Sequence, residues 1–225
     1  MSRGQGGTLL NPRITGSSTA TKGKFIVFEG IDGCGKTTQL KRLKYRMMSQ
    51  GIHCIDTYEP SDFLVGTLAR DTVKGGVVLE PETLALLFAA DRFDHTTRRI
   101  IPSLRRGISV LCDRYYYSNM AYQGLLFGHA RIMEINSDTM KKIRPDLVLF
   151  LDVPPEECAK RRAQNRFKDE LFDDLETQRK VRESYFKAMH LLGPDENIEV
   201  ISSSAGPDDV SALIWEKVAE CFTEV

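Results

Sequence analysis

Residues 30–38, Gly-Ile-Asp-Gly-Cys-Gly-Lys-Thr-Thr, constrain the fold of this chain more than any other segment. They match the phosphate-binding pattern G-x-x-x-x-G-K-[ST] in full. An apolar run at residues 24–29 precedes them, and a helical pattern at residues 39–50 follows them. In that setting the glycines let backbone N–H groups point at phosphate oxygens, and the helix start adds a positive dipole end. The segment therefore predicts a nucleoside triphosphate site at the end of a strand.

The residues of this loop have separate expected tasks. Lys36 should reach the β and γ phosphates, and the hydroxyl of Thr37 should bind Mg²⁺. The residues expected to contact the nucleotide are Gly30, Ile31, Asp32, Gly33, Cys34, Gly35, Lys36, Thr37 and Thr38. The alternative is a chance glycine-rich turn, which the strand and helix patterns on either side disfavour. Because GTPase switches, ATPases and small-molecule kinases share this loop, it predicts a nucleotide site without identifying a reaction.

Five short apolar runs are strand candidates, and helical patterns fill every gap between them. The runs are residues 24–29, 52–57, 108–112, 147–152 and 198–202. Strands and helices alternating at these spacings predict a three-layer, doubly wound α/β fold with a five-stranded parallel sheet. Gly51 and Gly107 stand where a helix should end before the next strand. Since ligands bind at the carboxyl ends of strands in such sheets, we expect the chemistry just after the strands.

The 225 residues fit one domain at 23–225, preceded by a tail at 1–22. The tail is rich in Gly, Ser and Thr, which predicts a flexible segment; its Arg3 and Arg13, with no acidic residue, leave an organelle transit peptide as the alternative. Lysine plus arginine equals aspartate plus glutamate at 31 each, so no overall charge favours nucleic acid or membrane as a partner. The five cysteines form no C-x-x-C pair, and no apolar run approaches the ~20 residues that span a bilayer. These features predict reduced cysteines and a cytoplasmic protein.

Two residue pairs suggest a second substrate. Phe88 and Arg92 lie four residues apart, so on a helix both side chains face one side, where a ring and a planar cation suit a nucleobase. A core phenylalanine beside an exposed charge fits this spacing equally well. Asp113 and Arg114 close a buried strand at the expected ligand edge. There Arg114 is expected to grip a phosphate and Asp113 to hold Mg²⁺ through water, with a simple ion pair as the alternative.

From residue 24 to 192 the chain resembles the thymidylate kinase family. Beyond the loop, the matching segments are residues 58–61, 87–92, 112–115, 118–124, 144–147, 151–155, 160–162 and 181–185. The resemblance implies a P-loop nucleoside monophosphate kinase-like fold with a short helical lid at about residues 160–172. It also implies ATP with Mg²⁺ as donor, dTMP as acceptor, dTDP as product, and a homodimer.

The resemblance also implies roles for single residues of the acceptor site. Phe88 should stack on thymine, Arg92 should hydrogen-bond a base carbonyl, and Asn119 should contact the base edge. Tyr122 and Gln123 should line the sugar and base and disfavour a 2′-hydroxyl. The full set expected to bind the acceptor is Asp32, Glu59, Phe88, Arg92, Arg114, Ser118, Asn119, Tyr122 and Gln123. From spacing alone, helix capping and surface polarity remain alternatives for the polar residues of this set.

The phosphate loop and the lid together determine where the catalytic charge is expected. Some family members carry an arginine in the loop, and others supply it from the lid. Here Gly33 and Cys34 occupy the loop positions, so the resemblance implies an arginine from the lid. The candidates are Arg161, Arg162 and Arg166, of which Arg162 and Arg166, four apart on one helical face, are the expected ones. A solvated charged face is the alternative. Asp32, in the same loop, should meet the 3′-hydroxyl of the acceptor, and the expected catalytic residues are Lys36, Arg114, Arg162 and Arg166.

One residue departs from the family pattern. Many members place arginine before the Glu-Pro step at 59–60, where this chain has Tyr58, which carries no charge at neutral pH. Either Arg70 reaches in from the next helix, or phosphate binding depends on Arg114.

Two other functions remain open. One is another nucleoside or nucleoside monophosphate kinase of the same fold; the residues that argue against it are Phe88, Arg92, Tyr122 and Gln123. The other is a P-loop NTPase switch, which the lack of an N-K-x-D element disfavours for GTP.

Overall fold

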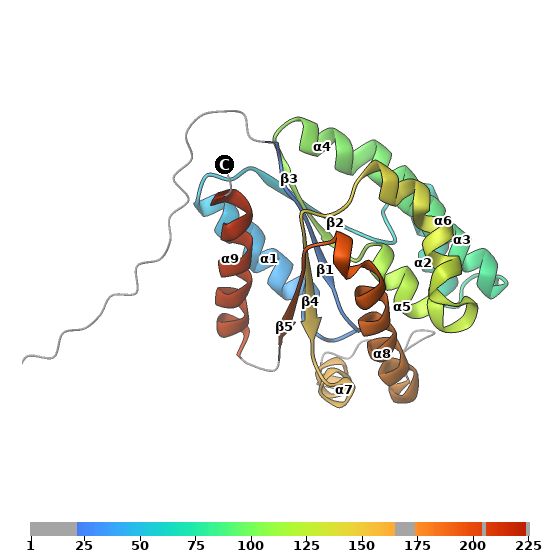
Figure 1. The fold of residues 1–225 in the computed structure, drawn as a ribbon. Coiled ribbons are helices and arrows are strands. Elements are labelled where there is room, and N and C mark those ends of the chain that lie inside the picture. The colour runs from blue at the N-terminus through green and yellow to red at the C-terminus, as the bar shows by residue number, and fades with distance from the viewer. Residues whose placement is uncertain (1–21, 165–173, 204–205, 224–225) are drawn as a thin grey trace, which may run out of the picture.

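The computed structural model describes residues 22–164, 174–203 and 206–223 (Figure 1). The predicted tail at residues 1–22 lies outside this part except for its last residue. The lid prediction at residues 160–172 lies outside it from residue 165 onward.

The described residues form one parallel sheet in the order β2-β3-β1-β4-β5. The strands are β1 (Phe25–Glu29), β2 (Cys54–Tyr58), β3 (Ser109–Asp113), β4 (Leu147–Asp152) and β5 (Ile198–Ser202). Each predicted run contains or overlaps one of them, and β2 begins two residues later than its run. The predicted five-stranded, doubly wound α/β fold is therefore confirmed.

Helices cover both faces of this sheet (Figure 1). One face carries α1 (Lys36–Ser49) and α9 (Pro207–Thr223), which contact each other. On the other side lie α2 (Leu64–Val73), α3 (Pro81–His95), a π-helical turn η1 (Thr96–Ile100), α4 (Ile101–Arg105), α5 (Tyr116–Phe127), α6 (His129–Lys142) and α8 (Leu175–Leu192). Beyond the end of β4 lies α7 (Pro155–Gln164), and a 3₁₀ turn η2 (Gly193–Asp195) precedes β5. Gly51 and Gly107, with φ of 78° and 75°, end their helices as predicted.

The core follows from the apolar runs. Every residue of the central strand β1 is at most 1 % exposed, because helices pack on both of its faces. The edge strands β2 and β5 are only partly buried. Among the described residues, no helix has both the length and the apolar character to cross a bilayer.

The parallel register brings four strand ends to one edge. Asp113 at the end of β3 pairs in register with Phe28 of β1 and with Tyr58 of β2. On the other side of β1, Glu29 pairs with Phe150 of β4. This edge therefore carries the polar residues that follow the strands, together with the loop after β1.

Candidate active site

The loop after β1 curls tightly and needs its glycines. Gly30, Gly33 and Gly35 have φ angles of 139°, 90° and 101°, which L side chains rarely adopt. A Cβ atom on Gly33 would lie 2.7 Å from the carbonyl oxygen of Cys158 in α7. A Cβ atom on Gly30 would lie equally close, 2.7 Å, to that of Leu151 in β4. The close approach of the loop to these two elements therefore excludes larger residues.

A broad pocket opens over this loop and holds most of the predicted nucleotide-binding residues. Residues 32–38 line it, whereas Gly30 and the buried Ile31 do not. Its other walls include α7 and the first turn of α9. The amino group of Lys36 is buried in the loop, 2.9 Å from the carbonyl oxygen of Gly30 and 3.1 Å from that of Ile31. We call this pocket the donor pocket.

Two oxygen-bearing side chains meet at the start of α1 and the end of β3. The hydroxyl of Thr37 donates to Oδ2 of Asp113 at 2.9 Å. The other oxygen, Oδ1 of Asp113, is buried and has no hydrogen-bond partner among the described residues. Hydroxyl and carboxylate oxygens are the hard ligands that Mg²⁺ prefers. The pair predicted to bind the metal therefore fits a Mg²⁺ ion beside the loop.

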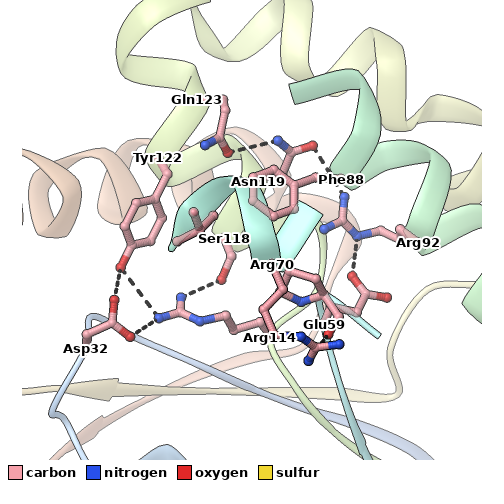
Figure 2. Close-up of a pocket in the computed structure, with 12 residues that line it drawn as sticks. Asp32, Glu59, Arg70, Phe88, Arg92, Arg114, Ser118, Asn119, Tyr122 and Gln123 are labelled. Carbon is pink, nitrogen blue, oxygen red and sulfur yellow. Dashed lines mark hydrogen bonds and ion pairs between the residues drawn. The ribbon is translucent and has the colours of Figure 1, made fainter. Parts of the chain in front are cut away.

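A second pocket lies next to the first, between the loop after β1 and helices α2, α3 and α5. All the residues predicted to bind the acceptor line it, together with Pro60, Arg70 and Val73 (Figure 2). Its empty space, including the part open to solvent, is about 730 Å³. We call this second site the acceptor pocket.

Arg114 lines both pockets and connects them. Its φ of 71° lies in the left-handed region, where non-glycine residues are uncommon. The guanidinium donates to Oγ of Ser118 at 2.9 Å and forms an ion pair with Asp32 (Figure 2). It also donates to the hydroxyl of Tyr185 at 3.1 Å. Burial acts to lower the pKa of Arg114, but the carboxylate of Asp32 raises it well above its ordinary value. Burial likewise acts to raise the pKa of Asp32, yet the cations of Arg114 and Lys36 hold it below its ordinary value.

The far wall of the acceptor pocket is a line of hydrogen-bonded side chains. Nε of Arg92 donates to Glu59 at 2.7 Å, and Nη1 donates to Oδ1 of Asn119 at 3.3 Å. The amide nitrogen of Asn119 donates to Oε1 of Gln123 at 3.0 Å. Phe88 projects into the same pocket from the helix that carries Arg92 (Figure 2). Arg92 is only 2 % exposed, so the alternative that it is an exposed helix charge is wrong.

Glu59 accepts a hydrogen bond from Arg92 with one carboxylate oxygen and contacts His95 with the other. This second oxygen lies 3.1 Å from Nδ1 of His95, whose Nε2 lies 2.7 Å from the hydroxyl of Thr57. Ligand atoms of Glu59, His95 and Cys112 lie within 4.8 Å of one another, which is close enough for a metal site. Because the Glu59 and His95 atoms already take part in hydrogen bonds, we interpret the cluster as an anchor for Arg92.

Comparison with known proteins agrees with this geometry. The sequence model of the thymidylate kinase family matches residues 28–214. A thymidylate kinase of Bradyrhizobium sp. is 37 % identical over 218 residues, which cover 91 % of this chain and 93 % of that protein. The chain belongs to the thymidylate kinase family. A probable thymidylate kinase of Pyrococcus abyssi is 39 % identical over 197 residues, covering 84 % of this chain and 92 % of that protein. A thymidylate kinase of Clostridium novyi is 38 % identical over 175 residues, covering 75 % of this chain and 85 % of that protein.

Arg70 lies close to the residue that departs from the thymidylate kinase pattern. Its guanidinium stacks 5.3 Å from the ring centre of Tyr58 and lines the acceptor pocket. Its Nη1 and Nη2 donate to the carbonyl oxygens of Pro60 at 3.2 Å and Ser61 at 2.6 Å. These contacts hold the cation at the pocket wall, as the first of the two alternatives for Tyr58 requires.

The segment predicted as a lid begins within α7, and two arginines of this helix line the donor pocket. Nη1 of Arg162 donates to the carbonyl oxygen of Asp32 at 2.6 Å. Arg161 pairs with Glu157 and donates to the carbonyl oxygen of Ser203 at 3.0 Å. Arg166, the other predicted lid arginine, lies outside the described residues.

Sequence reasoning missed Glu29, which closes β1 directly before the loop. It is 1 % exposed and accepts hydrogen bonds from Oγ of Ser118 at 2.6 Å and from the hydroxyl of Tyr185 at 2.9 Å. These are the same two hydroxyl groups that Arg114 contacts. Burial raises the pKa of Glu29, although Arg114 and the hydrogen bonds act to lower it. A charged residue at the end of an apolar run was the signal that could have identified it.

Proposed function

We propose that this chain transfers the γ-phosphoryl group of ATP, bound with Mg²⁺, to the 5′ phosphate of dTMP, giving dTDP and ADP. An oxygen of the acceptor phosphate forms a bond to the γ phosphorus, while the bond from that phosphorus to the β–γ bridging oxygen breaks. The bridging oxygen leaves with ADP. The observation that carries the proposal is the junction of the two pockets at Arg114 and Asp32.

In this proposal the donor pocket positions ATP and neutralises its charge. Backbone N–H groups of the loop and the start of α1 face the phosphates, and Lys36 exchanges its loop carbonyls for phosphate oxygens. Thr37 and Asp113 hold Mg²⁺, which supplies charge neutralisation to the phosphates when bound. Arg162 of α7 lines this pocket and donates to the carbonyl oxygen of Asp32, a position from which we propose that it neutralises charge on the transferring group. Arg166 is proposed to act with it on the resemblance alone.

In the acceptor pocket, different residues are proposed to bind the phosphate, the sugar and the base of dTMP. Arg114 and Arg70 are the cations that suit the 5′ phosphate, since a guanidinium matches phosphate oxygens in two-bond geometry. Asp32 and Tyr122, joined by a hydrogen bond of 2.9 Å, face the sugar. Phe88 stacks its ring on the base, and the polar side chains of the far wall form hydrogen bonds with the edge of the base.

A panel of acceptor nucleotides with MgATP tests the proposal directly. We expect phosphorylated product with dTMP, measured by chromatography of the nucleotides, and much less with CMP, UMP or AMP. A matched Lys36→Ala variant controls for contaminating kinases and should lose nearly all activity. Turnover of UMP or CMP without dTMP would instead favour another nucleoside monophosphate kinase. Hydrolysis of ATP that needs no acceptor would favour an NTPase switch.

The proposal also includes a cytoplasmic homodimer in which residues 23–225 are the kinase domain. The apolar side chains of Leu64, Leu68, Leu86 and Phe93 are 87 %, 42 %, 46 % and 40 % exposed on α2 and α3, which suits burial against a second copy. All five cysteines are free thiols, as expected in a reducing compartment. Light scattering during size-exclusion chromatography tests the dimer, with a Leu64→Glu variant expected to shift the mass toward the monomer.

A further inference from the structure

We propose that Asn136, a buried residue of α6 outside the acceptor pocket, fixes the hydrogen-bond polarity of the wall that faces the base. Through this polarity the wall accepts a pyrimidine with a 4-oxo group and rejects one with a 4-amino group. The inference rests on the proposed function and names a positioning residue that no sequence motif marked.

Asn136 connects two of the residues that face the base. It is 0 % exposed and does not line the pocket. Its Oδ1 accepts from Nη1 of Arg92 at 2.6 Å, and its Nδ2 donates to Oδ1 of Asn119 at 2.9 Å. The same nitrogen donates to the backbone carbonyl of Ile132 at 2.7 Å. Three directed contacts therefore hold one amide group.

The chemistry of the partners leaves this amide only one orientation. A guanidinium only donates, so the atom that faces Arg92 must be the carbonyl oxygen. A backbone carbonyl only accepts, so the atom that faces Ile132 must be the nitrogen. The two requirements are independent and agree. The side chain of Asn136 cannot flip without breaking both bonds, and an unpaired buried polar group is costly.

The orientation of the Asn136 amide affects the orientation of the amides of Asn119 and Gln123, which line the pocket. The oxygen of Asn119 accepts from two donors, Nδ2 of Asn136 at 2.9 Å and Nη1 of Arg92 at 3.3 Å, and its nitrogen therefore faces Gln123. Gln123 then accepts with its oxygen, which leaves its amide nitrogen as the group facing away from this chain of bonds. Among the described residues, no acceptor pairs with that nitrogen or with Nη2 of Arg92. The wall thus offers donors to a bound base.

Donors at this wall discriminate between pyrimidines by the group at position 4. Thymine and uracil carry an oxygen there, which accepts from a guanidinium or amide N–H group. Cytosine carries an amino group, which would face donors and stay unpaired in a buried site. A site built to hydrogen-bond one such group rejects the analogue that lacks it strongly, by up to ~10⁴–10⁵-fold. Asn136 acts on this preference through Asn119 and Gln123 and touches no substrate.

The test is a change of polarity at constant shape, Asn136→Asp. The new carboxylate still accepts from Arg92, but it turns an oxygen toward Oδ1 of Asn119 and toward the carbonyl of Ile132. We expect Asn119 to reverse and donate to the carboxylate, giving up only its longer, 3.3 Å contact from Arg92; Gln123 then reverses too, and an oxygen faces the base. Initial rates with dTMP, dUMP and dCMP give kcat/KM for each. We expect the dUMP to dCMP ratio to fall by about tenfold or more, the size of one unpaired buried polar group. The ratio of kcat/KM for dTMP to that for dUMP depends on contacts with the 5-methyl group, and it should stay within about twofold of the wild-type ratio.

Two further variants make the result decisive. Thr139→Val changes another buried polar residue of α6, 2 % exposed, which takes no part in the wall, and both ratios should remain at the wild-type values. Asn136→Leu removes the amide at similar volume, leaves only the 3.3 Å contact from Arg92 to orient Asn119, and should lower the dUMP to dCMP ratio even if Asn136→Asp fails to fold. Equal losses with all three nucleotides in a folded Asn136 variant would overturn the inference. A wild-type enzyme without activity on dTMP would refute the proposed function instead.

Discussion

Replacing Arg114 by alanine tests the proposed junction of the two pockets most directly. The side chain is 17 % exposed, lines both pockets, and contacts Asp32, Ser118 and Tyr185. Its guanidinium is preorganised by these contacts, so a phosphate would receive it without further ordering. Arg114→Ala removes that cation and leaves the backbone at the end of β3 in place.

The expected loss follows from the bonds that the guanidinium makes to a phosphate. Hydrogen bonds to charged groups contribute about 1.5–3 kcal/mol each, so a two-bond contact contributes about 3–6 kcal/mol. At 1.36 kcal/mol per factor of ten, kcat/KM for dTMP should fall by about 10²–10⁴-fold. Steady-state kinetics in a coupled ADP assay measures it. Arg98→Ala is the matched control, because that side chain is 61 % exposed and pairs with Asp94, four residues earlier at the end of α3. It should stay within about twofold, as expected of surface changes.

A glycine at the same position separates stability from activity. The φ of 71° costs a non-glycine residue about 1–2 kcal/mol, which glycine avoids. Glycine also makes the unfolded chain more flexible than alanine does, which lowers the free energy of unfolding by about 0.4–1 kcal/mol. Arg114→Gly should therefore be about 0.5–1 kcal/mol more stable than Arg114→Ala, or ~1–4 °C in thermal denaturation, and equally inactive. A variant that keeps a tenth or more of wild-type kcat/KM, or a glycine variant that melts below the alanine variant, would refute the reasoning.

Three shorter predictions concern the metal, the lid and pH. Asp113→Asn should raise the Mg²⁺ concentration for half-maximal velocity by about tenfold or more, since it replaces a carboxylate ligand by a neutral amide. Arg162→Ala should lower kcat by about 10²–10³-fold with little change in KM for dTMP, as expected when charge stabilisation in the transition state is lost. Because the pKa of Asp32 is held below its ordinary value of 3.8, its charge stabilises the fold fully above that pH and progressively less below it. Urea unfolding should thus show a stability gap between wild type and Asp32→Asn at pH 7 that shrinks by pH 3, whereas a constant gap would contradict the ion pair.

Part of the site could be predicted from the sequence because it depends on residues that are close together along the chain. The loop at residues 30–38 follows a strand and opens a helix, and this succession alone places its backbone. Phe88 and Arg92 needed only helical spacing to be predicted on one side. Asp113 and Arg114 needed only their place at the end of a buried run. Each of these predictions uses neighbours within about one helical turn or one strand.

The tertiary structure alone decided how these residues are held. Glu29 and Tyr185 lie 156 residues apart in the sequence and 2.9 Å apart at their bonded atoms. Asn136 on α6 forms hydrogen bonds with Arg92 and Asn119, although its helix carries no motif that marks it. Such contacts join the inner surfaces of different helices and strands, and each depends on which atom donates and which accepts. Sequence periodicity determines which face of an element is buried, but the partner across the interface is decided by packing between segments far apart in the chain.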